Sequence, residues 1–320
     1  MAKIGIDLEQ ARAHLANGEL VAIPTETVYG LAGNALNERA VASIFEVKQR
    51  PSFDPLIVHT NSLGKVRGFV NDIPETALTL AAEFWPGPLT MILKRKPLIP
   101  DLVTSGLDTV AVRIPRHPIT LQLLEKLDFP LAAPSANPFG YVSPTTAAHV
   151  EAQLGAKIPY ILDGGASHVG VESTIVSFEG EVPTVLRLGG LSVEDLERCI
   201  GKVKVNPHSS SQPVAPGMLK SHYAPRKTFE LIDSPKDFKL GENKHIAVLG
   251  FDTYLAGVDR SAQRLLSPQG DLNEAASRLF GFMRELDEVE GLEKIVALKV
   301  PNEGLGRAIN DRLSRAAAKG

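Results

Sequence analysis

The sequence predicts an α/β fold with helices packed on a sheet, followed by a smaller α/β domain. Short apolar runs typical of buried strands alternate with segments whose apolar residues recur at helical spacing. After Gly201 this periodicity is lost, and the chain is rich in Ser and Pro up to residue 227, which indicates a linker. We therefore expect a first domain over residues 1–201, a linker over 202–227 and a second domain over 228–320.

The first domain begins with a helix and a buried strand. Leu8, Ala11 and Leu15 recur at helical spacing, Gly18 follows, and the apolar run LVAIP comes next. Further strands are predicted at 55–59, 89–93, 109–114, 130–134, 159–163, 173–178 and 183–188. The segment LSVEDLERCI then has the pattern of an amphipathic helix, with the lone Cys199 on its buried side.

The second domain repeats this alternation on a smaller scale. FELID at 229–233 and HIAVLGFD at 245–252 are typical of strands, and KIVALKV at 294–300 predicts another. Between them lies an apolar stripe at helical spacing, which predicts one long helix: Leu272, Ala275, Ala276, Leu279, Met283 and Leu286.

Composition limits the function classes. The 320 residues include 34 basic and 37 acidic side chains, so the net charge of −3 gives no overall basic field for nucleic acid. Residues 1–20 carry charges and lack the apolar core of a signal peptide, and no apolar stretch is long enough to cross a membrane. These features favour a cytoplasmic protein without a membrane partner.

Polar clusters follow several of the predicted strands, where open α/β sheets place ligands. PTETVYGL puts Thr27 and two further hydroxyls beside a carboxylate, although such hydroxyls also cap turns. KQRPSFDPLIVH places Lys48 and Arg50 before a strand that His59 closes, and two cations there suit a phosphate. Arg113 lies inside the apolar run TVAVRI, so we expect an acidic side chain or a ligand carboxylate beside it.

Three later clusters have equally good explanations as turns or as binding loops. AAPSAN carries Ser135 and Asn137, and its small residues let a ligand approach the backbone. The glycine-rich DGGASHVGVEST leads to Ser173, and backbone N–H groups in such turns can bind anions. LRLGG places Arg187 at a strand end. No GxxxxGK[ST], GxSxG or HExxH motif occurs, which argues against a P-loop enzyme, a serine hydrolase and a zincin.

In this order the motifs resemble the threonylcarbamoyl-AMP synthase family over nearly all of residues 10–190. They are PTETVYGL, the Lys-x-Arg-Pro loop with PLIVH, WPGPLT, DTVAVRIPRHP, AAPSAN, DGG with GVEST, and LRLGG. APGMLKSHYAP at 215–225 and the tail GLGRAINDRLSRAA are similar to the two-domain members. The resemblance implies a YrdC-like twisted, open mixed sheet with helices and a Rossmann-like C-terminal domain. It also implies synthesis of threonylcarbamoyl-AMP from L-threonine, bicarbonate and ATP for a tRNA modification.

The resemblance also implies which residues bind the substrates. It further implies that the linker forms a lid. L-Threonine would contact Thr27, His59, Arg113, Ala133 and Ser173. ATP would contact Lys48, Arg50, Asp54, Thr109, Ser135, Asn137, Ser143, Arg187 and Tyr223. Lys48 and Arg50 would position the phosphates, and Mg²⁺ would enter with ATP. No general base and no metal-binding side chain is identified.

The expected partners and the alternatives complete the sequence-based hypothesis. A tRNA threonylcarbamoyl transferase complex would use the product, and contact with tRNA is possible. One alternative is a double-stranded RNA-binding module on the same fold. Another is a different adenylate-forming or carbamoyl-transfer enzyme. Binding of RNA without any threonine dependence would favour the first, and a substrate screen would identify the second.

Overall fold

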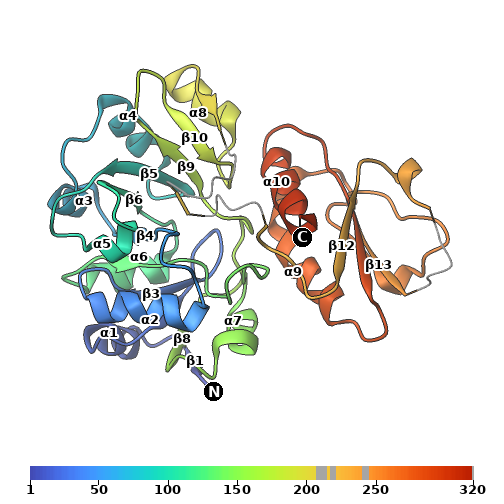
Figure 1. The fold of residues 1–320 in the computed structure, drawn as a ribbon, viewed down its shortest axis with the longest axis horizontal. Helices are drawn as coiled ribbons and strands as arrows, with labels where there is room; N and C mark the ends of the chain where they lie inside the picture. Colours follow the sequence, from blue (N-terminus) through green and yellow to red (C-terminus); the bar gives the residue numbers. More distant parts are fainter. Residues whose placement is uncertain (207–214, 217–220, 240–244, 319–320) are drawn as a thin grey trace.

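The computed structural model describes residues 1–206, 215–216, 221–239 and 245–318 of the chain. It contains a larger α/β domain and a smaller C-terminal one, joined by the linker (Figure 1). The predicted linker residues 207–214 and 217–220 lie outside the described part. Among the described helices, none is long and apolar enough to cross a bilayer.

The larger domain is built on one mixed sheet of 11 strands in the order β1-β8-β2-β3-β7-β4-β6-β5-β9-β10-β11. Its strands are β1 (Lys3–Gly5), β2 (Val21–Ile23), β3 (Gly30–Asn34), β4 (Ile57–His59), β5 (Leu89–Lys94), β6 (Thr109–Arg113), β7 (Leu131–Ala132), β8 (Tyr160–Leu162), β9 (Thr174–Ser177), β10 (Thr184–Arg187) and β11 (Lys204–Val205). β4 and β6 are parallel, whereas β5 runs antiparallel to β6. This pairing brings the end of β4, the end of β6 and the start of β5 together at one end of the sheet's strands.

Helices cover both faces of this sheet. They are α1 (Leu8–Ala16), α2 (Glu38–Lys48), α3 (Leu63–Phe69), α4 (Glu75–Phe84), α5 (Asp101–Thr104), α6 (Pro118–Glu125), α7 (Ala147–Leu154) and α8 (Val193–Ile200). In β2, Val21 and Ile23 pack in one apolar cluster with α1 and α6, and Ala22 packs in another with α2. This follows from the period of two along a strand. Both faces are therefore apolar, and polar groups collect at the strand ends.

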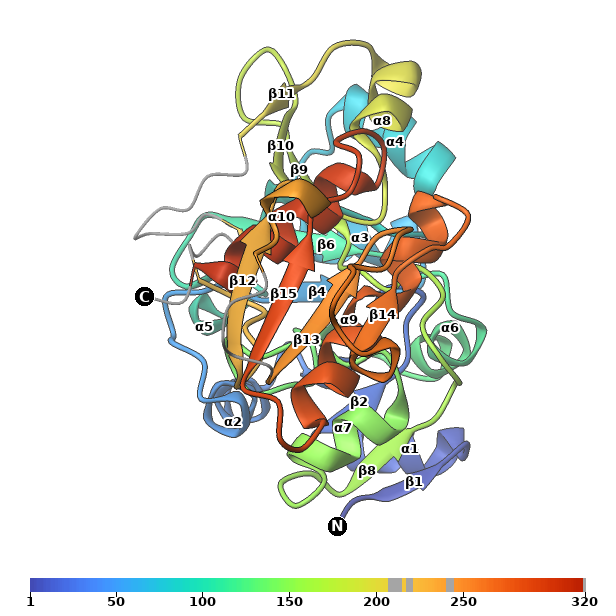
Figure 2. The same ribbon diagram turned by 90° about the vertical axis from the view of Figure 1, so that its right-hand side faces the viewer.

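The C-terminal domain has a fully parallel sheet of four strands in the order β12-β15-β13-β14. Its elements are β12 (Thr228–Ile232), η1 (Pro235–Asp237), β13 (Ile246–Gly250), η2 (Arg260–Ala262), β14 (Gln263–Leu265), α9 (Leu272–Glu288), β15 (Lys294–Leu298) and α10 (Gly306–Ala317). Figures 1 and 2 show α9 and α10 between this sheet and the larger domain. These two helices therefore carry the contacts between the domains.

The predicted fold class is confirmed, and every strand named from the sequence is present. Four strands were not predicted: β1, β3, β11 and β14. Each is short or contains several small or polar residues, so its apolar pattern is weak. Because β11 pairs with β10, the first sheet extends to Val205, beyond the expected boundary at residue 201. Cys199 is only partly buried on α8.

We predict that Gly189→Ala lowers the free energy of unfolding by about 1 to 3 kcal/mol. A Cβ at this position would lie 2.3 Å from the carbonyl oxygen of Glu172 and 2.4 Å from the backbone of Ser173. Denaturant titration measures the change. Gly68→Ala in α3 is the matched control, since nothing lies within 4 Å of its Cβ, and there alanine should stabilise. Equal stability of the Gly189→Ala protein and the wild type would contradict this account.

Candidate functional site

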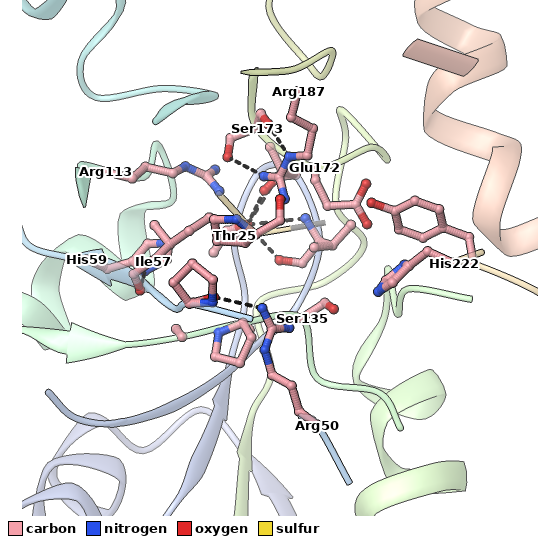
Figure 3. Close-up of a pocket in the computed structure, with 18 residues that line it drawn as sticks. Thr25, Arg50, Ile57, His59, Arg113, Ser135, Glu172, Ser173, Arg187 and His222 are labelled. Carbon is pink, nitrogen blue, oxygen red and sulfur yellow. Dashed lines mark hydrogen bonds between the residues drawn. The ribbon is translucent and has the colours of Figure 1, made fainter. Parts of the chain in front are cut away.

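A pocket lies where the ends of several strands of the larger sheet meet the linker. Figure 3 shows Arg113 and His59 on one side and His222 on the opposite side. The lining residues are Thr25, Thr27, Val28, Gly30, Arg50, Pro55, Ile57, His59, Arg113, Ala133, Pro134, Ser135, Glu172, Ser173, Arg187, Pro216, His222 and Tyr223. All the residues predicted to bind L-threonine are among them.

The strand register brings His59 and Arg113 together. They are the last residues of the parallel strands β4 and β6, and they are paired partners. Arg113 is 4% exposed, and its Nη2 lies 2.8 Å from Oε1 of Glu26. The other carboxylate oxygen of Glu26 accepts a hydrogen bond from the backbone N–H of Arg116 at 3.0 Å. The acidic partner expected for Arg113 is thus present inside the PTETVYGL motif.

His59 faces this ion pair as a neutral ring. Burial, and secondly the positive charge of Arg113, lower the pKa of His59 to about 3, against the effect of its contact with the Ile57 carbonyl. Its Nδ1 lies 3.2 Å from that carbonyl oxygen. A neutral imidazole leaves the local charge to Arg113 and can exchange hydrogen bonds with a polar ligand.

Thr25 organises the PTETVYGL turn. Its hydroxyl donates to the Val28 carbonyl at 2.7 Å and accepts from the backbone N–H groups of Thr27 and Val28 at 3.2 Å. The Thr25 and Thr27 hydroxyls lie 2.8 Å apart. These local hydrogen bonds take the place of the backbone hydrogen bonds of a β-sheet. They therefore hold the turn in one conformation at the pocket wall.

Ser173 joins the two halves of the pocket. Its hydroxyl lies 2.7 Å from that of Thr90 at the start of β5, and it accepts a hydrogen bond from Arg187 Nη2 at 3.0 Å. Arg187 Nε donates to the Ser173 carbonyl, and Nη1 reaches the Pro216 carbonyl of the linker at 3.3 Å.

Arg187 differs from the other lining arginines because its charge is not neutralised by a described carboxylate in contact with it. Arg113 pairs with Glu26 and Arg50 pairs with Asp54, but no described carboxylate lies within 4.0 Å of the Arg187 nitrogens. Burial is the main cause that lowers the pKa of Arg187 to about 10, so its guanidinium remains charged near neutral pH. A buried cation without an acidic partner attracts an anion.

The KQRPSFDP loop closes on itself. Arg50 Nη2 lies 3.0 Å from Asp54 Oδ2 and donates to the Pro55 carbonyl at 2.7 Å. Asp54 is fully buried and does not line the pocket. Its carboxylate thus forms an ion pair with Arg50. This pairing explains how an acid is tolerated beside a predicted phosphate site.

Lys48 lies behind the pocket wall. Its ammonium donates to the carbonyls of Ser135 and Asn137, both at 2.6 Å. Burial, and secondly the charge of Arg50, hold the pKa of Lys48 well below its ordinary value. Lys48 therefore fixes the AAPSAN loop, whose Ser135 lines the pocket.

Three other predicted ATP residues also lie outside the lining. Asn137 donates to the Tyr141 carbonyl at 2.8 Å, and Ser143 donates to Glu172 Oε1 at 2.5 Å. Thr109 begins β6 and Arg113 ends it, so the two lie at opposite ends of that strand. The direct contacts predicted for these residues with ATP stay predictions.

The linker contributes residues to the pocket, as a lid requires. Pro216, His222 and Tyr223 belong to its lining, and the rings of His222 and Tyr223 are 4.1 Å apart. Tyr223 has a φ of 66° and is buried. Closure of this segment on a ligand stays a prediction, because residues 217–220 lie outside the described part.

Sequence reasoning gave no protein partner to several residues that the fold brings here. Thr25 was a candidate hydrogen-bond donor to a ligand, and Glu26 and Glu172 were visible in the PTETVYGL and GVEST motifs, but nothing in the sequence showed which residue each contacts. His222 lines the pocket from the linker. Arg312 reaches Glu172 from α10, and no sequence signal could have found it.

Family models match nearly the whole chain. One described as "Telomere recombination" (Sua5_yciO_yrdC) covers residues 13–189, and one described as "Threonylcarbamoyl-AMP synthase, C-terminal domain" covers residues 191–318. The chain belongs to the threonylcarbamoyl-AMP synthase family. The family predicted from the sequence is thereby confirmed.

Individual members of this synthase family are similar over almost their full length. The threonylcarbamoyl-AMP synthase of Pyrococcus abyssi is 41% identical over 96% of this chain and 92% of its own, and that of Bacillus subtilis is 39% identical over 97% and 92%. A crystal structure of P. abyssi Sua5 complexed with L-threonine has a TM-score of 0.90 and 40% identity, and it covers 97% of this chain and 94% of its own.

We predict that the protein loses stability as the pH falls below about 6.5. The unfolded chain would protonate His59 near pH 6.5, whereas the folded chain resists protonation down to about pH 3. The free energy of unfolding should therefore fall between these values. Denaturant titrations from pH 7.5 to 4.5 measure the slope, which His59→Gln should reduce and the exposed control His168→Gln should not. An unchanged slope in His59→Gln would be inconsistent with a buried neutral ring.

Proposed function

We propose that this protein forms threonylcarbamoyl-AMP and pyrophosphate from L-threonine, bicarbonate and ATP. The observation that carries the proposal is one pocket whose three lining arginines, Arg50, Arg113 and Arg187, differ in their ion-pair partners. Arg113 is paired with Glu26 beside a neutral His59, whereas Arg187 forms no ion pair within 4.0 Å with a described carboxylate. This asymmetry suits an amino acid at one end and a polyanion at the other.

The amino acid would bind at the Arg113 end. Its carboxylate would take the fork of Arg113, which Glu26 already orients. The hydroxyls of Thr27 and Ser173 and the imidazole of His59 line the same end and offer hydrogen bonds to a side-chain hydroxyl and an amine. Ala133 adds a small apolar surface for the methyl group of threonine.

The nucleotide would occupy the other end. Arg187 and Arg50 would face the phosphates, while Ser135 and Tyr223 line the neighbouring wall. Lys48 would act through the loop that it holds. ATP would enter as its Mg²⁺ complex. Phosphate oxygens and water would be the ligands of that ion.

Catalysis in this proposal depends on placement. The threonine amine would react with bicarbonate, with loss of water, and a carbamate oxygen would then attack the α-phosphate and release pyrophosphate. Holding these reactants in line is worth up to about 7 to 11 kcal/mol. Arg187 and Arg50 would stabilise charge that develops on the phosphates. This chemistry makes the protein a nucleotidyltransferase.

The reactive product requires a consumer. A mixed carbamic–phosphoric anhydride hydrolyses in water, so we propose that a tRNA threonylcarbamoyl transferase complex uses it in the cytoplasm. The linker residues around Tyr223 would shelter it until release.

The proposed reaction makes pyrophosphate release depend on both small substrates. With ATP present, release should need L-threonine and bicarbonate together, because the carbamate is the group that is adenylated. The assay withholds each substrate in turn, in degassed buffer for bicarbonate. Equal turnover without threonine would refute the proposal. Salt-sensitive RNA binding without such turnover would instead support the RNA-binding alternative.

The two arginines should separate the two substrates. Arg113→Ala is predicted to weaken L-threonine binding by roughly 2 to 5 kcal/mol, because it removes the partner of a desolvated carboxylate, and to leave ATP binding nearly intact. Arg187→Ala should show the opposite pattern. Isothermal titration of each ligand measures both. A reversed pattern would show that L-threonine binds at the Arg187 end and ATP at the Arg113 end.

A further inference from the structure

The C-terminal domain inserts one arginine beneath the pocket. Arg312 lies on α10, yet it is 0% exposed. Its Nε donates to Oε2 of Glu172 at 3.1 Å, and its Nη1 donates to the Leu188 carbonyl at 2.5 Å. Nη1 also lies 3.0 Å from Asp311 of the same helix. A guanidinium from the second domain is therefore bonded to two segments of the first.

Glu172 is the acid that this arginine reaches, and it is the only acid among the described residues that line the pocket. Both of its oxygens are engaged, one by the Ser143 hydroxyl at 2.5 Å and the other by Arg312. A carboxylate in this position repels the phosphates of ATP unless a cation compensates its charge. Arg312 is the cation in contact with it.

The same guanidinium also contacts the linker. Its central carbon lies 5.3 Å from the centroid of the Tyr223 ring, and that ring stacks on Phe280 of α9 at 5.5 Å and 29°. Cation–π contact and stacking hold an aromatic ring in a fixed orientation. Two pocket residues, Glu172 and Tyr223, are thus held by the C-terminal domain.

We propose that Arg312 is a positioning residue of the active site, which compensates the charge of Glu172 and orients Tyr223 so that the anionic phosphates of ATP can enter the pocket. The proposal rests on the proposed function, since it assumes that ATP binds there. It gives the C-terminal domain a direct part in forming the nucleotide site. It also predicts which substrate is affected, because ATP carries several negative charges and L-threonine is a neutral zwitterion.

The test compares binding of the two substrates by isothermal titration in the full-length chain. Arg312→Ala should raise the dissociation constant of ATP at least about tenfold and that of L-threonine less than about threefold, because a buried acid is left uncompensated. The double variant Arg312→Ala/Glu172→Gln removes both charges, and it should recover most of the ATP affinity. Arg312→Lys keeps the charge and should bind ATP within about threefold of the wild type.

Arg307→Ala is the matched control. Arg307 lies on the same helix and pairs across the same domain boundary with Glu194 at 2.8 Å, but its side chain is 35% exposed and does not line the pocket. It should bind both ligands like the wild type. Circular dichroism melts establish that each variant is folded. If Arg312→Ala does not fold, the lysine and double variants still test the proposal.

Three results would overturn this role of Arg312. They are wild-type ATP affinity in folded Arg312→Ala, an ATP affinity in the double variant no better than in Arg312→Ala, and a tenfold loss in Arg312→Lys. Failure of the proposed function looks different. In that case the wild type itself releases no pyrophosphate with threonine and bicarbonate, and it binds neither ligand.

Discussion

The site depends on the ion pair between Arg113 and Glu26. An arginine at the end of a buried strand is costly to desolvate, and Glu26 makes that placement tolerable. The pair also ties the end of β6 to the turn after β2, two segments that other strands separate in the sheet. The pocket that contains this guanidinium is also lined by Thr25, Thr27 and His59. The same ion pair therefore compensates the buried charge and fixes the shape of the pocket.

This principle applies to the other buried cations. Arg50 has Asp54, Lys48 has two backbone carbonyls, and Arg312 has Glu172. Arg187 is hydrogen-bonded to serine and carbonyl oxygens and has no described carboxylate within 4.0 Å, so its guanidinium can pair with a ligand. The electrostatic asymmetry of the pocket arises from which arginine has an acidic partner. Residue type alone does not produce it.

The domain boundary extends this arrangement to the second domain. α9 and α10 lie against the larger domain (Figure 1), and they contribute charged and aromatic groups there as well as apolar ones. Arg284 donates to the carbonyl of Ser143, and Tyr141 donates to Asp287. Because Ser143 also bonds to Glu172, the contact between the domains continues into the pocket wall. The C-terminal domain is thus coupled to the site through hydrogen bonds that need a fixed geometry.

The sequence by itself determined the fold class, most strands, the long helix α9 and the family. Apolar periodicity survives without any tertiary information, because burial on a sheet or helix imposes it locally. The motif order placed Thr27, His59, Arg113, Ala133 and Ser173, which the fold brings into one pocket. β3, with the sequence GLAGN, and the two-residue β11 carried too little apolar pattern to be predicted.

Only the tertiary structure decided the partners of the charged residues. Lys48 and Arg50 have the charges of a phosphate-binding loop, yet in the fold Lys48 donates to two carbonyls and Arg50 pairs with Asp54. Arg312 lies 140 residues from Glu172 in sequence, and their contact exists only because the two domains pack together. Electrostatic pairing depends on distance in space and on burial. Neither quantity can be read from the order of residues along the chain.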